Sequence, residues 1–162
     1  MGLSAITKMN YLQNMKITRR PGAAVDWTAG ANFNIFQVQG NAVLVVNLFG
    51  VVTTLMGAGA AVPQFSFTPT GGAAVGMSAA MLTIAGDVAG SVYVWDGVTA
   101  TVPAPAAQIG WADSAEAGWN GDPGILPVGI IRITNAVVCA AGVVDYYICY
   151  IPCSPASQVI AL

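Results

Sequence analysis

The side chains that usually carry acid–base and nucleophilic chemistry are nearly absent from this sequence. It contains no histidine, a single glutamate (Glu116) and aspartates that are scattered from Asp26 to Asp145. A hydrolytic triad needs a general base beside its nucleophile, and the usual imidazole is missing. The stretch Gly76–Ala80 has a serine at its centre but lacks the second glycine of a nucleophile elbow. The sequence therefore predicts a protein that is not an enzyme.

Cofactor and metal motifs are also missing. Gly57-Ala58-Gly59 is followed by neither the Lys-Ser or Lys-Thr of a phosphate-binding loop nor the third glycine of a dinucleotide site. The three cysteines, Cys139, Cys149 and Cys153, have spacings that match no zinc site. We therefore expect no cofactor and no metal. The odd number of cysteines leaves two alternatives, buried free thiols or a Cys149–Cys153 bridge, and is compatible with a reducing cytoplasm.

The surface of a free monomer would carry very few charges. Charged residues make up 7% of the 162 residues and hydrophobic ones 56%, with a mean hydropathy of +0.68, whereas about a quarter of an ordinary soluble chain is charged. The length is that of one domain, whose folded surface would offer roughly 600 Å² per charge. We infer that sister copies, other proteins or lipid cover much of the exterior.

The uncharged stretch from Trp27 to Gly86 raises the question of a membrane. Its most apolar part, residues 42–62, is rich in β-branched residues and is interrupted by Asn47 and several glycines. Basic residues do not flank it, as they usually flank a spanning helix. The pattern favours strands and no membrane contact, with a transmembrane helix over 42–62 as the weaker alternative.

Basic residues gather at the amino-terminal end. Lys8, Lys16, Arg19 and Arg20 lie in the first twenty residues, which contain no acid, and Arg132 is the only later base. This split predicts a basic N-terminal arm over residues 1–21 and a single acidic, β-rich domain over residues 22–162. The arm either docks on an acidic neighbour or simply solubilises the terminus. We expect no nucleic acid partner, because the sequence pI of about 4.5 opposes a polyanion.

Alternating and β-branched segments predict strands along most of the chain, after a short helix over Ser4–Ile17. The expected strands are Phe33–Val38, Ala42–Leu55, Phe65–Thr68, 91–95, 98–102, 128–134, 137–141 and 143–151. The second of these is long enough to need a bulge near Asn47 or Gly50. Pro69–Gly72 has turn chemistry, and residues 73–86 fit either a helix or a strand.

Two further features lie in the middle of the chain. Asp96-Gly97 predicts a two-residue turn that joins strands 91–95 and 98–102 as a hairpin. A long loop follows over residues 103–127 and contains Trp111, Asp113, Glu116 and Trp119. A loop of this length usually has a function. These four residues therefore form either a contact surface or, through the tryptophans, a plug at the rim of the core.

The number and spacing of strands predict an all-β fold. About eight to ten short strands, with a short N-terminal arm or helix, are typical of a β-sandwich, a jelly-roll-like fold or a small barrel. Such sheets need to protect their edges, and this chain has few lysines to do so. Pairing with a neighbouring subunit is the expected protection.

Three segments give the chain a resemblance to a known class. Residues 34–40, 67–72 and 126–131, in a histidine-free sequence rich in Gly, Ala, Val and Thr, resemble small virion proteins of tailed bacteriophages, especially capsid decoration or cement proteins. The resemblance implies a homo-oligomer, a trimer above all, which assembles in the host cytoplasm. It would bind the major capsid protein on the outside of the capsid and stabilise the shell. Lys8, Lys16, Arg19 and Arg20 of the arm would make that contact.

Two other functions fit the same sequence. The chain resembles a phage tail, fibre or head-fibre component as well, where a β-rich uncharged surface would mediate stacking. From another class, a carbohydrate- or cell-surface-binding module would use Trp95, Trp111 and Trp119.

Overall fold

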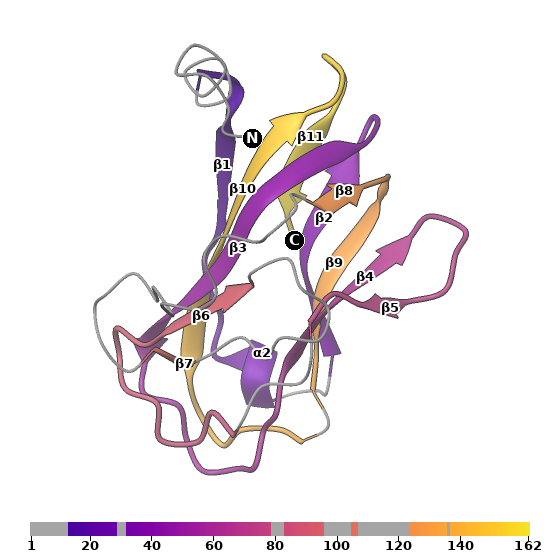
Figure 1. The fold of residues 1–162 in the computed structure, drawn as a ribbon. Coiled ribbons are helices and arrows are strands. Elements are labelled where there is room, and N and C mark those ends of the chain that lie inside the picture. The colour runs from indigo at the N-terminus through magenta and orange to yellow at the C-terminus, as the bar shows by residue number, and fades with distance from the viewer. Residues whose placement is uncertain (1–12, 29–31, 79–82, 96–104, 107–123, 136) are drawn as a thin grey trace, which may run out of the picture.

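The computed structural model describes residues 13–28, 32–78, 83–95, 105–106, 124–135 and 137–162 (Figure 1). Strands account for most of this part of the chain, and the short helix α2 (Val25–Thr28) lies at one end of the molecule. The strands form two antiparallel sheets. The predicted all-β fold is confirmed.

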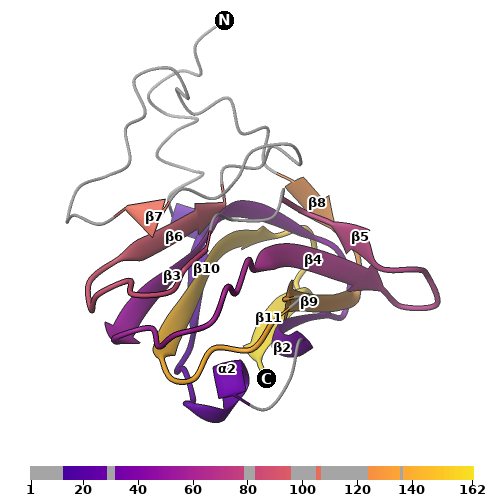
Figure 2. The same cartoon turned by 90° about the horizontal axis from the view of Figure 1, so that it is seen from below.

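The two sheets lie one over the other as layers (Figure 2). Sheet A has the order β1 (Lys16–Arg20), β10 (Val143–Pro152), β3 (Val43–Thr54), β6 (Val92–Trp95) and β7 (Pro105–Ala106), with β8 (Gly124–Leu126) also paired to β3. Sheet B has the order β11 (Gln158–Ala161), β2 (Asn32–Gln39), β9 (Gly129–Thr134), β4 (Gln64–Pro69) and β5 (Val75–Gly76).

The strand pairing is nested. β1 pairs with β10, β2 with β9, β3 with β6, and β4 with β5. Rolling up this long double ladder brings β10 beside β3 in sheet A and β9 beside β4 in sheet B. This is the connectivity of an eight-stranded jelly roll, to which β7, β8 and β11 add short edge pairings. Of the predicted architectures, the structure is therefore the jelly-roll sandwich.

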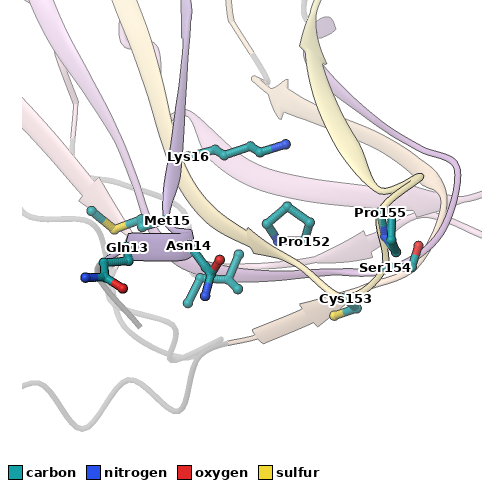
Figure 3. Close-up of a pocket in the computed structure, with 9 residues that line it drawn as sticks. Gln13, Asn14, Met15, Lys16, Pro152, Cys153, Ser154 and Pro155 are labelled. Carbon is teal, nitrogen blue, oxygen red and sulfur yellow. The ribbon is translucent and has the colours of Figure 1, made fainter. Parts of the chain in front are cut away.

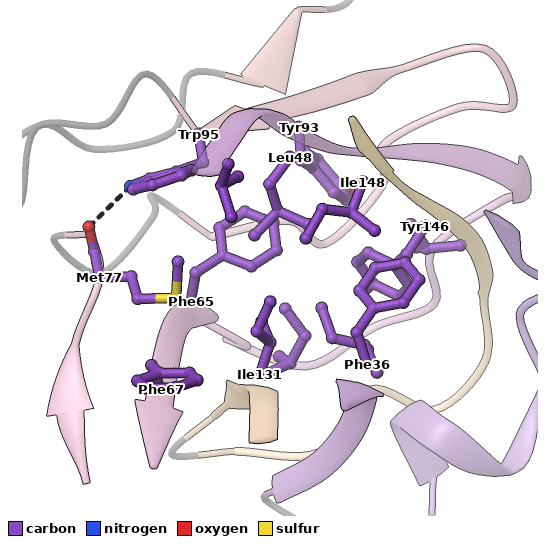
Figure 4. Close-up of a cluster of buried hydrophobic side chains, with 14 of the residues drawn as sticks. Phe36, Leu48, Phe65, Phe67, Met77, Tyr93, Trp95, Ile131, Tyr146 and Ile148 are labelled. Atoms are coloured by element: carbon purple, nitrogen blue, oxygen red, sulfur yellow. Dashed lines mark hydrogen bonds between the residues drawn. The ribbon is translucent and has the colours of Figure 1, made fainter. Parts of the chain in front are cut away.

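The core lies between the sheets, because alternate residues of each strand point inward. Sheet A contributes Leu48, Tyr146 and Ile148, and sheet B contributes Phe36, Phe65 and Ile131, among others (Figure 4). The Phe65 ring meets Tyr146 edge-on, with 6.4 Å between ring centroids. Tyr146, Ile148 and Tyr150 share the inward face of β10.

Local features of β3 and β4 also agree with the sequence. Opposite β3, Cys149 pairs with Asn47 and Tyr150 with Val45, so Val46 is an extra residue and the bulge predicted near Asn47 is confirmed. After β4, the amide of Gly72 donates to the Pro69 carbonyl over 3.0 Å. This bond closes the predicted turn.

Three segments differ from the predicted secondary structure. Residues 137–141 form no strand: the Cys139 amide donates to the Trp27 carbonyl in α2, and the Ala140 amide donates to the carbonyl of Ala58, between β3 and β4. The predicted helix over Ser4–Ile17 is wrong at its end, because Lys16 and Ile17 belong to β1. β11 was not predicted.

Other expectations fall partly or wholly outside the described residues. β5 shows that part of the ambiguous segment 73–86 is a strand. Residues 92–95 of the predicted hairpin form β6, whereas its Asp96-Gly97 turn and the strand 98–102 lie outside the described residues. No helix in the described ranges is long and apolar enough to cross a membrane, and residues 43–54 of the suspected span are the strand β3.

Candidate interaction surfaces

Each sheet of the sandwich has an outward face, and the strand register assigns its residues. On the outer face of sheet A, side chains line up across β1, β10, β3, β6 and β8. The rows are Asp145–Val51–Val92, Arg19–Tyr147–Phe49–Val94, Ile17–Cys149–Asn47 and Ile151–Leu44–Ile125. Nine of these thirteen side chains are aliphatic or aromatic, and they point away from the core.

Aromatic stacking marks the middle of this face. The rings of Phe49 and Tyr147, cross-strand partners, lie almost parallel with centroids 5.0 Å apart. At two borders, Ile17 on β1 and Ile125 on β8 are 62% and 67% exposed. The outer face of sheet A is therefore an apolar surface that this protomer does not fully bury.

The charges on this face form a pair. The Arg19 guanidinium donates to the Asp145 carboxylate, with 2.6 Å between Nη2 and Oδ2, and the Gly22 amide donates to the other carboxylate oxygen over 2.8 Å. Burial alone would raise the pKa of Asp145, but the hydrogen bonds from Gly22 and Arg19 outweigh it and hold that pKa below its usual value. The pair thus neutralises itself at the β1 edge.

The lowered pKa of Asp145 makes a prediction about pH. A carboxylate whose pKa is lower when folded adds stability above its unfolded pKa of about 3.9, and that stability is lost as the pH falls through the folded value. We expect the wild type to be more stable than Asp145→Asn at pH 7. Urea unfolding from pH 7 to pH 2.5 should show this difference shrinking below about pH 4. A difference that is constant over this range would contradict the assignment.

The outer face of sheet B has a different chemistry. Its rows are Gln158–Gln39, Ile160–Gln37–Ile130–Thr68, Asn34–Arg132–Ser66–Gly76 and Asn32–Thr134–Gln64. Amides and hydroxyls dominate, and several bond to one another, as in Gln158 to Gln39 over 3.2 Å and Ser66 to Thr134 over 2.7 Å. The sandwich therefore has one apolar and one polar, almost uncharged exterior.

The predicted basic arm is corrected by the structure. Lys16, Arg19 and Arg20 lie in β1, which pairs with β10 inside sheet A, so these residues do not belong to a separate arm over 1–21. Arg20 points inward and forms an ion pair with Asp26 at 2.6 Å. Arg19 and Arg20 are both engaged within the chain rather than free for an acidic neighbour. Lys8 lies outside the described residues.

Lys16 borders a shallow groove of about 500 Å³ at one end of the sandwich (Figure 3). The other lining residues are Gln13–Met15 before β1 and Ile151–Pro155 at the end of β10. The groove combines one amine, one exposed thiol at Cys153 and a serine, Ser154. The Ser154 hydroxyl lies 3.0 Å from the Ser157 hydroxyl, so its hydrogen-bond partner is a second hydroxyl.

The predicted contact loop falls outside the described part of the chain. Trp111, Asp113, Glu116 and Trp119 lie outside the described residues. Trp95, the third candidate for sugar binding, is a core residue with 7% exposure. Its indole Nε1 donates to the Met77 carbonyl over 2.8 Å (Figure 4). Trp95 therefore offers no ring face for stacking on a sugar.

The cysteines are free thiols. Cys139 is buried, Cys149 is half-buried on the outer face of sheet A, and Cys153 is exposed, so the Cys149–Cys153 bridge is not formed. Burial raises the pKa values of the Cys139 and Cys149 thiols. Among the described residues, no group of three or more His, Cys, Asp or Glu side chains lies close enough to hold a metal.

The chain was compared with family models, curated proteins and solved structures. None of the three comparisons gives a match. The interpretation of the surfaces therefore rests on their own chemistry. Sequence reasoning had not singled out the outer face of sheet A, although β10 carries a signal for it: apolar residues occupy both faces of that strand.

Proposed function

We propose that this chain is a non-enzymatic structural protein of a virion, specifically a decoration protein on the capsid exterior. The observation that carries the proposal is the contrast between the two outer faces of the sandwich. A subunit of an assembly needs an apolar surface that contacts other subunits and a polar surface that remains compatible with water. The jelly-roll connectivity supports the proposal, since this fold is common in viral capsid proteins.

The outer face of sheet B is suited to contact with a repeating protein shell. Its amide and hydroxyl groups exchange hydrogen bonds with water for hydrogen bonds with a partner, without the large cost of desolvating many charges. Each contact of this type is weak. An oligomer that presents several copies of the face would bind a lattice much more tightly than one copy.

Co-sedimentation with expanded capsids of the source phage tests this function. We expect the wild type to sediment with the shells at a saturating ratio fixed by the lattice. The near-isosteric variant Gln37→Glu places a charge on the outer face of sheet B and should weaken binding about tenfold. Desolvating the new carboxylate costs more than the hydrogen bond from the Gln39 amide, which donates to Gln37 Oε1 over 3.1 Å, returns.

The matched control is Val25→Ala, which removes an exposed side chain from α2, away from both outer faces. It should bind like the wild type. Failure of the wild type to sediment with capsids would reject the decoration function. Binding to isolated tails instead would place the protein among tail or fibre components.

A further inference from the structure

We infer that the outer face of sheet A is the contact between copies of this chain. The inference rests on the proposed function as a multi-copy structural protein, and names the partner of one specific surface. It goes beyond the general expectation of an oligomer because it assigns the contact to β1, β10, β3, β6 and β8.

The size of the face is that of a functional surface patch. Neighbouring strands lie about 4.8 Å apart and successive outward residues about 6.8 Å apart. Four strands and four rows therefore span about 14 Å by 20 Å between Cα atoms, and the side chains extend further. This extent is comparable with the largest apolar patches of soluble monomers, about 300–600 Å², which are often functional.

The composition of the face resembles the centre of a protein interface. Phe49 and Tyr147 stack in its second row, with Val94 and Val51 beside them. Aromatic residues are enriched at the centres of interfaces, where charged residues are depleted. In contrast, the outer face of sheet B carries amides and hydroxyls at the corresponding positions. Of the two outer faces, only that of sheet A therefore has the composition of an interface centre.

The polar groups on the face favour an identical copy as the occupant. Arg19 and Asp145 already neutralise each other at the β1 edge, so two such faces do not bring unpaired like charges together. Asn47, in the third row, has an amide that is both donor and acceptor, and two copies of it can pair. An acidic partner such as nucleic acid would find no free cation in these rows.

Sedimentation velocity of the full chain tests the inference. We expect the wild type to form a discrete oligomer, and both Phe49→Glu and Ile125→Lys to raise its dissociation constant at least ~100-fold, because each places an unpaired charge in the contact. Gln37→Glu, on the outer face of sheet B, is the control and should keep the mass of the wild type.

Ile125 is already 67% exposed, so Ile125→Lys leaves the protomer fold intact even where Phe49→Glu does not. Circular dichroism verifies this. A monomeric wild type at about 100 μM, or an oligomer that survives Ile125→Lys, would overturn the inference. The two proposals fail separately: an oligomer that ignores capsids removes only the decoration function, and a monomer that binds capsids removes only this contact.

Discussion

Replacing Asp26 with alanine is expected to destabilise the protein by about 3 kcal/mol, because it leaves the Arg20 guanidinium as an unpaired charge in a mostly buried site. The two side chains are only 10% and 7% exposed, and the carboxylate accepts two hydrogen bonds from Arg20, at 2.6 and 2.9 Å. The same guanidinium donates to the Leu162 carbonyl over 2.7 Å and lies 5.6 Å from the centre of the Phe33 ring. One ion pair thus ties β1, α2 and the end of β11 together.

Equilibrium unfolding in urea measures this effect. The control is the double variant Arg20→Met with Asp26→Leu, which removes both charges and keeps apolar volume. It should recover most of the lost stability, because a buried pair is costly to break but inexpensive to replace as a whole. A loss below about 0.5 kcal/mol for Asp26→Ala would show that water reaches the pair and screens it.

The second large effect is expected at Gly40, in the turn between β2 and β3. Its φ is +77°, and a Cβ built on it would lie 1.9 Å from the carbonyl oxygen of Ala156. Gly40→Ala therefore adds a backbone clash to the cost of a left-handed conformation. We expect it to lose at least ~3 kcal/mol, since strain of this type alone costs about 1–3 kcal/mol.

Gly71 supplies a matched control for the clash. It has the same φ of +77°, but no atom lies within 4 Å of its added Cβ. Gly71→Ala should therefore show only the conformational cost of about 1 kcal/mol. Thermal or urea unfolding of both variants separates the two contributions. Equal losses for the two variants would mean that the Ala156 loop moves aside without cost.

Local sequence patterns predicted the strands that have one apolar and one polar face or that lie between clear turns. Phe33–Val38 and Phe65–Thr68 lie within β2 and β4, and the crowded run after Ala42 contains the bulge near Asn47. The outcome differs at residues 137–141, whose apolar character is typical of a strand. There the amides of Cys139 and Ala140 donate instead to carbonyls of α2 and of the segment between β3 and β4.

The interaction surface was harder to predict for a related reason. Alternation identifies the inward face of a strand only when the other face is polar. In β10, Tyr146 and Ile148 point inward while Tyr147 and Cys149 point outward, and the residue types do not distinguish them. Only the register with β3 shows that Tyr147 meets Phe49 on the outside.

The predicted arm extended too far along the chain, because ion-pair partners depend on topology. Arg19 meets Asp145, which is 126 residues away in sequence, after β1 pairs with β10. Charge counting along the chain shows an unopposed basic segment, whereas the fold places an acid beside each of these two arginines.

The alkylation rate of Cys149 tests the assigned contact most directly, because this thiol lies on the outer face of sheet A and the exposed Cys153 serves as an internal reference. Mass spectrometry after timed treatment with iodoacetamide gives both rates in one sample. In the wild type, Cys149 should react much more slowly than Cys153. In Ile125→Lys, whose substitution lies in a different row of the face, the Cys149 rate should rise several-fold while that of Cys153 stays constant. An equal Cys149 rate in the wild type and in Ile125→Lys would contradict the account.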